Sequence, residues 1–256
     1  MIIVNADDFG KNENINKAII DCFNEGLCSS TTIMSNMPHF EHAVELAHEI
    51  GINKGCIGIH LNLTEGKPMT DKMRLNTRFC NSNGYFNKDA LRVEKVLALS
   101  SEEKDALVSE IKAQINRCRE SNIRITHLDS HHHVHTIFPL LKIIDEVCKA
   151  EGIPYVRQAN NIYSNSKLRL IYNKLFINGY LNKKGVLLTQ GFCDLNSYER
   201  ILHGKNSFNN LEIMIHPCYK NGHIYDGDND NLLYLIKKLL KNEIKLYSYG
   251  NASTSL

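Results

Sequence analysis

Short apolar runs alternate with amphipathic stretches along most of this chain. The apolar runs are rich in β-branched residues, which is typical of buried strands. The stretches between them repeat apolar residues every three or four positions, as helices with one buried face do. Strands are predicted at residues 2–6, 30–35, 57–63, 123–130, 154–157, 185–189, 211–216 and 245–249. Helices are predicted at residues 14–25, 41–50, 139–151, 167–181 and 230–242, and another begins at Ser100.

Strands that alternate with helices favour parallel pairing, because each helix returns the chain to the same end of the sheet. Seven or eight such units in 256 residues fit a TIM-like (β/α) barrel, whose typical length is about 250 residues. The strand count favours a distorted or seven-stranded barrel, and an open doubly wound sheet is the alternative. No repeat or linker divides the chain, so residues 1–256 are expected to form a single domain.

The region from 65 to 99 follows neither periodicity and contains the turn-forming residues Gly66 and Gly84. It is expected to be a long loop insertion, and such loops often cover a site. Directly after it, Ser100 and Glu103 have the spacing of a capping box, which predicts the start of a helix.

Composition excludes several classes of protein. A formal net charge of +2 provides no basic stripe, so nucleic acid is not an expected partner. No stretch approaches the roughly 18 apolar residues of a membrane span, and the first residues do not resemble a signal peptide. Eight cysteines are present without a C-x-x-C pair, which argues against a zinc ribbon. A cytoplasmic protein with reduced thiols is therefore expected.

The segment from Thr126 to His135 contains five of the twelve histidines and an aspartate. Imidazole and carboxylate are the side chains that bind divalent metals when thiolates do not. Because side chains alternate along a strand, His127, Asp129 and His131 are expected on one face. The run ends a predicted strand, where active sites of parallel α/β proteins usually lie. A polyhistidine stretch without function is the alternative.

Two adjacent carboxylates, Asp7 and Asp8, follow the first predicted strand. On a regular strand they would point to opposite sides. Gly10 permits a sharp turn, so both are expected to reach one pocket. The alternative is that Asp8 only caps the following helix.

Polar side chains also interrupt or end three other apolar strands. His60 and Asn62 share one face of the strand at 57–63, and a polar face inside a strand needs partners. His216 ends the strand at 211–216 and is a candidate acid or base. Arg157 ends the strand at 154–157 and could orient a carboxylate by a bidentate contact, although a surface arginine is equally compatible with the sequence.

Four of these segments together resemble the YdjC-like carbohydrate deacetylases. Their order and spacing match across most of the chain, at residues 5–10 (NADDFG), 58–61 (GIHL), 126–135 (THLDSHHHVH) and 215–217 (IHP). The resemblance implies a distorted (β/α) barrel, related in its chemistry to the wider polysaccharide deacetylases. It also implies removal of N-acetyl groups from chito-oligosaccharides or similar acetylated sugars, and often a homodimer.

The resemblance further implies a division of roles among the site residues. Asp8, His60 and His131 correspond to the metal ligands, Asp7 to the general base and His216 to the general acid. The metal implied is magnesium. Two imidazoles suit zinc or another transition metal better on chemical grounds, because magnesium prefers oxygen ligands.

Several questions stay open at the level of sequence. The resemblance assigns no role to His127, Asp129, His132, His133 and His135, although Asp129 could hold His127 or another imidazole in one tautomer. One alternative function is a different metal-dependent hydrolase on the same fold, such as a phosphodiesterase or an amidase. Another is a metal-binding protein without enzymatic activity.

Overall fold

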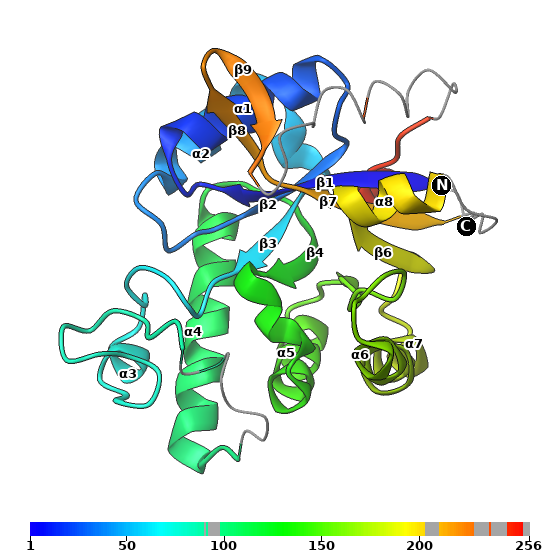
Figure 1. Cartoon of the computed structure of the whole chain (residues 1–256). Helices are drawn as coiled ribbons and strands as arrows, with labels where there is room; N and C mark the ends of the chain where they lie inside the picture. The colour runs from blue at the N-terminus through cyan, green and yellow to red at the C-terminus, as the bar shows by residue number, and fades with distance from the viewer. Residues whose placement is uncertain (90, 92–97, 203–209, 228–235, 237–244, 253–256) are drawn as a thin grey trace.

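Seven parallel strands form one sheet in the computed structural model, which describes residues 1–89, 91, 98–202, 210–227, 236 and 245–252. The strands are β1 (Ile2–Phe9), β2 (Ser30–Ile33), β3 (Ile57–Leu61), β4 (Ile125–Ser130), β5 (Tyr155–Val156), β6 (Gly191–Asp194) and β7 (Leu211–Ile215). Their order in the sheet is β5-β4-β3-β2-β1-β7-β6. Every neighbour is consecutive in the chain except β1 and β7, whose pairing joins the two ends as a barrel does. An open doubly wound sheet would not pair the first strand with the last. The fold is therefore a distorted, seven-stranded (β/α) barrel, as the sequence predicted, and the described strands leave it open between β5 and β6 (Figure 1).

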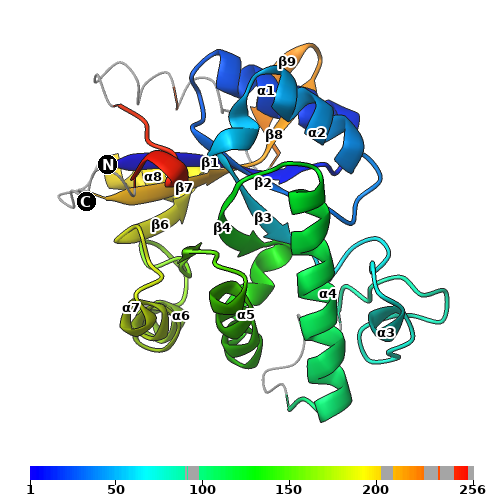
Figure 2. The same cartoon turned by 180° about the vertical axis from the view of Figure 1, so that it is seen from behind.

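Helices follow the strands in regular alternation. They are α1 (Glu13–Asn24), α2 (Phe40–Glu49), α4 (Ser101–Glu120), α5 (Phe138–Ala150), α6 (Lys167–Tyr172), the π-helical η3 (Asn173–Asn178), α7 (Gly179–Lys184) and α8 (Leu195–Leu202). Figures 1 and 2 show α1 and α2 on one side of the strands, and α4 to α7 on the other. The capping box at Ser100 and Glu103 is present. It starts α4, which buries Leu107 and Ile111 against the sheet.

Two predictions of secondary structure were wrong or incomplete, and a third falls almost entirely on residues that the structure does not describe. The apolar run at 185–189 is not a strand, because pairing with β7 begins only at Gly191. The run instead crosses to β5 as an irregular segment, where the carbonyl of Val186 accepts a hydrogen bond from the amide of Val156. The strand at 245–249 reduces to a bridge between Leu246 and Ile2, followed by the short helix α10 (Tyr249–Ala252). The helix expected at 230–242 lies outside the described residues apart from residue 236.

A hairpin that the sequence analysis missed follows β7. Its strands are β8 (Pro217–Lys220) and β9 (His223–Asp226), and it packs beside α1 (Figure 1). Asn221 and Gly222 form its turn, and both have positive φ. The Asn-Gly pair is a strong hairpin signal that the sequence did contain. The expected insertion at 65–99 includes the short helix α3 (Asp71–Arg74).

The interior of the barrel is polar, whereas the layer between strands and helices is apolar. On β1 the polar Asn5 and Asp7 flank Ala6, and on β4 the polar His127 and Asp129 flank Leu128, so each polar pair shares one face of its strand. Several polar side chains of the seven strands are buried: Asn5, Asp7, Thr32, His60, His127, Asp129 and Glu212. Arg157, directly after β5, is also buried. A polar barrel interior demands that each group finds a partner, and this requirement shapes the site.

Candidate metal centre and active-site cavity

The end of β1 delivers two adjacent carboxylates to the same cavity. Asp8 has a φ of +71°, and the pairing of β1 with β2 shifts register between Ala6 and Phe9. This irregularity turns the backbone, so Asp7 and Asp8 both line the cavity. The turn was expected at Gly10, but Asp8 itself already adopts the left-handed conformation. The cap of α1 is Asn12, whose side chain accepts a hydrogen bond from the amide of Ile15, so Asp8 is left for another purpose.

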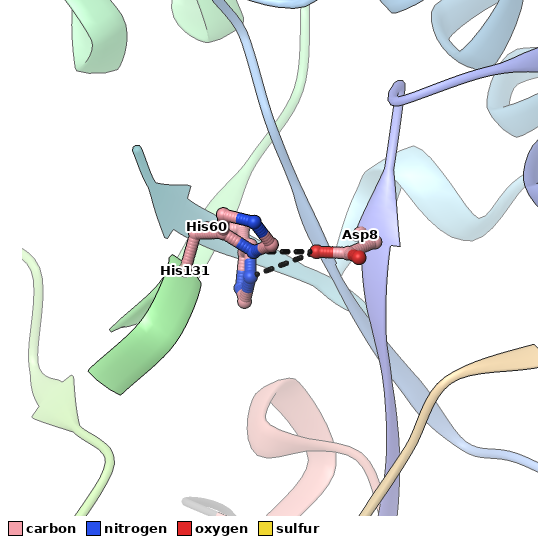
Figure 3. A group of neighbouring side chains, drawn as sticks. All are labelled: Asp8, His60 and His131. Carbon is pink, nitrogen blue, oxygen red and sulfur yellow. Dashed lines mark ion pairs between the residues drawn. The ribbon is translucent and has the colours of Figure 1, made fainter. Parts of the chain in front are cut away.

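Two imidazoles from neighbouring strands meet the carboxylate of Asp8 (Figure 3). His60 lies on β3, and its Nε2 is 3.2 Å from Oδ1 of Asp8. His131 lies directly after β4, in the 3-10 helix η2 (His131–Thr136), and its Nδ1 is 3.0 Å from the same oxygen. All three side chains are buried. Residues separated by more than a hundred positions thus converge on one point, as the sequence predicted.

The carboxylate of Asp129 orients His60. Its Oδ1 lies 2.7 Å from Nδ1 of His60, and a carboxylate accepts a hydrogen bond. Nδ1 therefore carries a proton, and Nε2 faces Asp8. Burial opposes charge on His60, but Asp129, Asp8 and Asp7 outweigh it and raise the pKa of the imidazole to about 10. The imidazole that Asp129 holds is His60 rather than His127.

Arg157 lies at the centre of the polar interior and is fully buried. Its guanidinium donates to both oxygens of Asp7 at 2.6 and 2.7 Å, which is the bidentate contact that the sequence suggested. It also contacts Asp129 at 2.5 Å and Glu212 at 2.8 Å. Burial favours the neutral form of Asp7, but Arg157 outweighs it and holds the pKa of that carboxyl well below its usual value.

Glu212 and Tyr249 complete this interior network, and the sequence analysis missed both. The hydroxyl of Tyr249 donates to Glu212 at 2.6 Å. A lone acid inside the apolar strand at 211–216 was the available signal. Burial raises the pKa of Glu212 against the opposing effect of Arg157.

The other histidines of the run have different surroundings. His127 is buried away from the cavity, where its ring stacks on Tyr249 with centroids 3.7 Å apart. A side chain at Gly58 would come within 2.5 Å of that ring, so this position must remain a glycine. His135 is buried against the hydroxyl of Ser130 at 2.6 Å. The contacts of His127 and His135 are with other side chains of the protein, so their role is to stabilise the fold. Burial lowers the pKa of both imidazoles well below the usual value.

His132 and His133 lie at the cavity and both have a φ of +55°. Nδ1 of His132 lies 2.9 Å from the hydroxyl of Thr64. Burial and the nearby Arg157 lower the pKa of His133 to about 3, so this imidazole is neutral at ordinary pH.

His216 follows β7 and lines the same cavity as Asp7 and Asp8. Asp226 of the hairpin accepts a hydrogen bond from its backbone amide at 2.7 Å. The same carboxylate oxygen is 3.9 Å from Nδ1 of the imidazole. The hairpin therefore holds His216 in place and supplies a negative charge beside it.

The cavity has a volume of about 610 Å³. A second cavity of about 240 Å³ shares His133, Arg169 and Met214 with it and is also lined by Tyr163 and Phe192. Leu91 of the insertion lines the larger cavity, so the insertion does reach the site. Two aromatic residues of the insertion line neither of these cavities: Phe86 is buried in the core, and Tyr85 is exposed.

Asp8, His60 and His131 fit a divalent metal ion. Donor atoms that each lie about 2.1 Å from one ion are about 3.0–3.4 Å apart, which matches the distances of 3.0 and 3.2 Å to Asp8. In the part of the chain that the structure describes, Oδ1 of Asp8 is buried without a hydrogen-bond partner. An unsatisfied buried oxygen beside two imidazoles is what a metal ligand without its ion looks like.

Asp7, His60 and Asp129 are a second group with suitable atoms, and Glu65, His131 and His132 are a third. In the second group, Arg157 already contacts both carboxylates, so that group contains its own cation. The Asp8 group is the better candidate for a metal ion.

Comparison with known proteins identifies the family of this chain. The profile of the family described as YdjC-like protein matches residues 1–244. The chain belongs to the YdjC-like family. A relative from Clostridium beijerinckii, named carbohydrate deacetylase, is 32% identical over 232 residues, which cover 89% of this chain and 85% of the relative.

Two solved structures share the fold. One, from Enterococcus faecalis V583, is provisionally described as a cellobiose-phosphate cleavage protein. It has a TM-score of 0.74 at 24% identity and covers 97% of both chains. A CE4 esterase from Streptococcus mutans has a TM-score of 0.50 at 13% identity, over 97% of this chain and 84% of the esterase. At such low identities these likenesses concern the fold alone.

Proposed function

We propose that this YdjC-like protein is a metal-dependent hydrolase that removes N-acetyl groups from acetylated carbohydrates such as chito-oligosaccharides. The observation that carries the proposal is the meeting of Asp8, His60 and His131 in a cavity that Asp7 and His216 also line. The relatives named carbohydrate deacetylase support the reaction class. The smaller adjoining cavity supports a substrate of more than one sugar ring.

Asp8, His60 and His131 would hold the ion, since two imidazoles and one carboxylate leave open positions on it. A bound divalent ion polarises the acetyl carbonyl and lowers the pKa of a nearby water molecule. Asp7 accepts the proton of the attacking water. Arg157 fixes both oxygens of Asp7 and keeps the carboxylate ionised. The low pKa makes Asp7 a weak base, so the attacking water has to be acidified.

His216 donates a proton to the departing amine. The carboxylate of Asp226 lies 3.9 Å from Nδ1 and supplies a negative charge beside the imidazole. His133 also lines the cavity, but its pKa of about 3 means that it cannot serve as an acid near neutral pH. It is suited to binding the substrate as a neutral hydrogen-bonding group.

The reaction is tested by acetate release from diacetylchitobiose with the wild type and with Asp7→Asn. We expect the variant to lose about 10²–10⁴-fold in kcat, the usual contribution of a general base, while it still binds metal. Absence of acetate with every acetylated sugar tried, for a protein that carries its metal, would contradict the proposal. Two ions per chain in elemental analysis would favour a phosphodiesterase-type hydrolase instead.

The metal is magnesium according to the family resemblance, but its donors favour a transition metal. Magnesium prefers oxygen ligands, and zinc, cobalt, nickel or iron accept imidazole readily. We expect metal-free protein reconstituted with zinc or cobalt to be at least as active as protein reconstituted with magnesium.

We also propose that the protein is a homodimer. In the segment from α6 to η3, polar side chains face the protein and apolar side chains face solvent. Asn173 and Asn178 form hydrogen bonds with backbone groups of residues 159 and 160. Its outer face carries five large apolar side chains that are 43–79% exposed, namely Leu168, Ile171, Tyr172, Leu175 and Phe176. A contiguous apolar face of this kind marks an interaction surface.

A second copy of this face would bury the apolar side chains of both chains. All charged residues from 167 to 184 are basic, so the pairing should strengthen as salt screens their repulsion. Light scattering should therefore give a dimer at high salt, and a monomer for Leu168→Ser combined with Leu175→Ser. A wild-type monomer at all salt concentrations, or a dimer unaffected by the substitutions, would contradict this interface.

The cytoplasm is the proposed location. All eight cysteines are free thiols, six of them buried, which fits a reducing compartment. Among the described residues, no helix combines the length and apolar character needed to cross a membrane.

A further inference from the structure

Each of the two imidazoles that face Asp8 has a second ring nitrogen, and a carboxylate lies beside each of these nitrogens. For His60 the carboxylate is Asp129, at 2.7 Å from Nδ1. For His131 it is Glu65, whose Oε2 lies 3.4 Å from Nε2. Asp129 comes from the strand that ends in the histidine run, whereas Glu65 comes from the loop after β3 and had drawn no attention in the sequence.

The position of Glu65 is built into the fold. Asn62 accepts a hydrogen bond from its amide at 3.0 Å and donates to its carbonyl at 2.9 Å. Asn36 donates to the same carbonyl at 3.2 Å. Asn62 itself is fully buried. The backbone of Glu65 is therefore fixed, and its side chain reaches Lys11 and His131, which line the cavity.

Lys11 links Glu65 to the other side of the cluster. Its ammonium nitrogen lies 3.3 Å from Oε2 of Glu65 and 3.1 Å from Oδ2 of Asp8. The contacts form a closed ring from Asp8 through Lys11 and Glu65 to His131, and back to Asp8. Lys11 thus occupies the second oxygen of Asp8 and leaves Oδ1 to face the imidazoles.

A neutral imidazole that binds a cation through one nitrogen carries its proton on the other. Nδ1 of His131 faces Asp8, so the proton belongs on Nε2. That nitrogen is buried without a hydrogen-bond partner of good geometry among the described residues. Glu65 is the carboxylate beside it, and a small adjustment of this partly exposed side chain would make the hydrogen bond.

We propose that Glu65 is a positioning residue that holds His131 in the metal-binding orientation and tautomer, as Asp129 does for His60. The inference rests on the metal centre of the proposed function. The two histidines then have matched carboxylate partners, and partners of this kind typically contribute 10–100-fold to metal affinity.

The other reading of Glu65 is as a ligand of a second ion, together with His131 and His132. Two contacts oppose it. Lys11 lies beside Oε2 of Glu65, the oxygen that faces His131, whereas at Asp8 it contacts Oδ2 and leaves Oδ1 to the imidazoles. Nδ1 of His132 is engaged with the hydroxyl of Thr64. The geometry therefore favours one ion with Glu65 outside its ligand set.

The test is the affinity of the metal-free full chain for Zn²⁺, measured by competition with a chromophoric chelator, for the wild type, Glu65→Ala, Glu65→Gln and Glu49→Gln. We expect Glu65→Ala to bind zinc about 10–100-fold more weakly. Glu65→Gln should lie between it and the wild type, because its amide oxygen still accepts a hydrogen bond. Glu49→Gln, at an exposed glutamate of α2, should not change the affinity. The melting temperature of each metal-free variant shows whether it is folded.

Histidine ¹⁵N spectra of the zinc-loaded wild type supply an independent readout. They should show Nδ1 of His131 bound to zinc and Nε2 protonated. The proposal is overturned if Glu65→Ala binds zinc as tightly as the wild type, or if zinc binds Nε2. It is also overturned if the wild type takes up two zinc ions and Glu65→Ala loses one. If the wild type binds zinc as described but releases no acetate, the proposed reaction is wrong, whereas the proposed role of Glu65 is unaffected.

Discussion

Asp7 and Asp8 are neighbours in the sequence, yet they lie in two different electrostatic environments. Asp7 belongs to a network in which Arg157 contacts Asp7, Asp129 and Glu212 inside the barrel. Asp8 belongs to a cluster in which its Oδ1 faces two imidazoles and has no hydrogen-bond partner among the described residues. Arg157 is the cation of the first group. In the second group Lys11 pairs with Oδ2 of Asp8, while Oδ1 and the two imidazoles are spaced for a cation from solution. A buried charge has to be paired, so what already pairs each carboxylate indicates its role.

The largest effect is expected when Arg157, the cation inside the barrel, is removed. Arg157→Met would leave three carboxylates buried without their partner. We expect a loss of about 3–5 kcal/mol in the free energy of unfolding, as is usual when one partner of a buried ion pair is removed. Urea unfolding of the metal-free protein measures it. Arg124→Met, at an exposed arginine, should change stability by no more than about 0.5 kcal/mol. A similar small change for Arg157→Met would mean that the network is not paired as described.

A second test removes the carboxylate of Asp8 from its cluster with His60 and His131. Asp8→Ala should weaken Zn²⁺ binding by more than the roughly 100-fold that an outer partner contributes, because it removes a ligand. Asp7→Asn is the matched control, since it alters the neighbouring carboxylate and should keep most of the affinity. Equal losses in the two variants would remove the distinction between Asp7 and Asp8.

The smallest effect concerns a neutral histidine inside the barrel. Burial and Arg157 lower the pKa of His127 well below the usual imidazole value of about 6.5. As the pH falls through that value, this imidazole takes up a proton in the unfolded chain but not in the native protein. The stabilisation that comes from neutral His127, measured as free energy of unfolding, is complete above about pH 6.5 and declines as the pH falls. The decline approaches about 1.4 kcal/mol per pH unit.

Urea unfolding between pH 7 and pH 5 tests this sign. His127→Gln should have a shallower pH dependence than the wild type. His223→Gln, at an exposed histidine of the hairpin, should leave the pH dependence unchanged. If His127→Gln and the wild type have the same slope, His127 is protonated in the native state.

The strands and helices that bear strong periodicity were predictable from the sequence. The capping box at Ser100 and the buried stripe of α4 are local signals, and the structure contains both. The apolar run at 185–189 misled the strand prediction, because burial alone does not distinguish a strand from an irregular buried segment. In the segment from α6 to η3, Asn173 and Asn178 are buried while Leu168 and Leu175 are exposed. Predictions of a helix's buried face assume the opposite, namely that its apolar side chains are buried.

The site was predictable where polar groups end apolar strands, as at Asp8, His60 and His131. The partners of these residues were harder to find. Arg157 and Asp7 are 150 residues apart, and nothing in the local pattern of either one identifies the other. Glu65 lies in a loop whose composition is ordinary, and only its contact with His131 shows its relevance.

The proposed metal centre takes up one divalent ion at Asp8 and none at Asp7 and Asp129. Anomalous diffraction from crystals loaded with Zn²⁺ would locate the ion. We expect one ion per chain in contact with Oδ1 of Asp8, Nε2 of His60 and Nδ1 of His131, while Arg157 keeps its contacts with Asp7. An ion bound between Asp7 and Asp129, or no ion at the Asp8 cluster in zinc-loaded crystals, would contradict it.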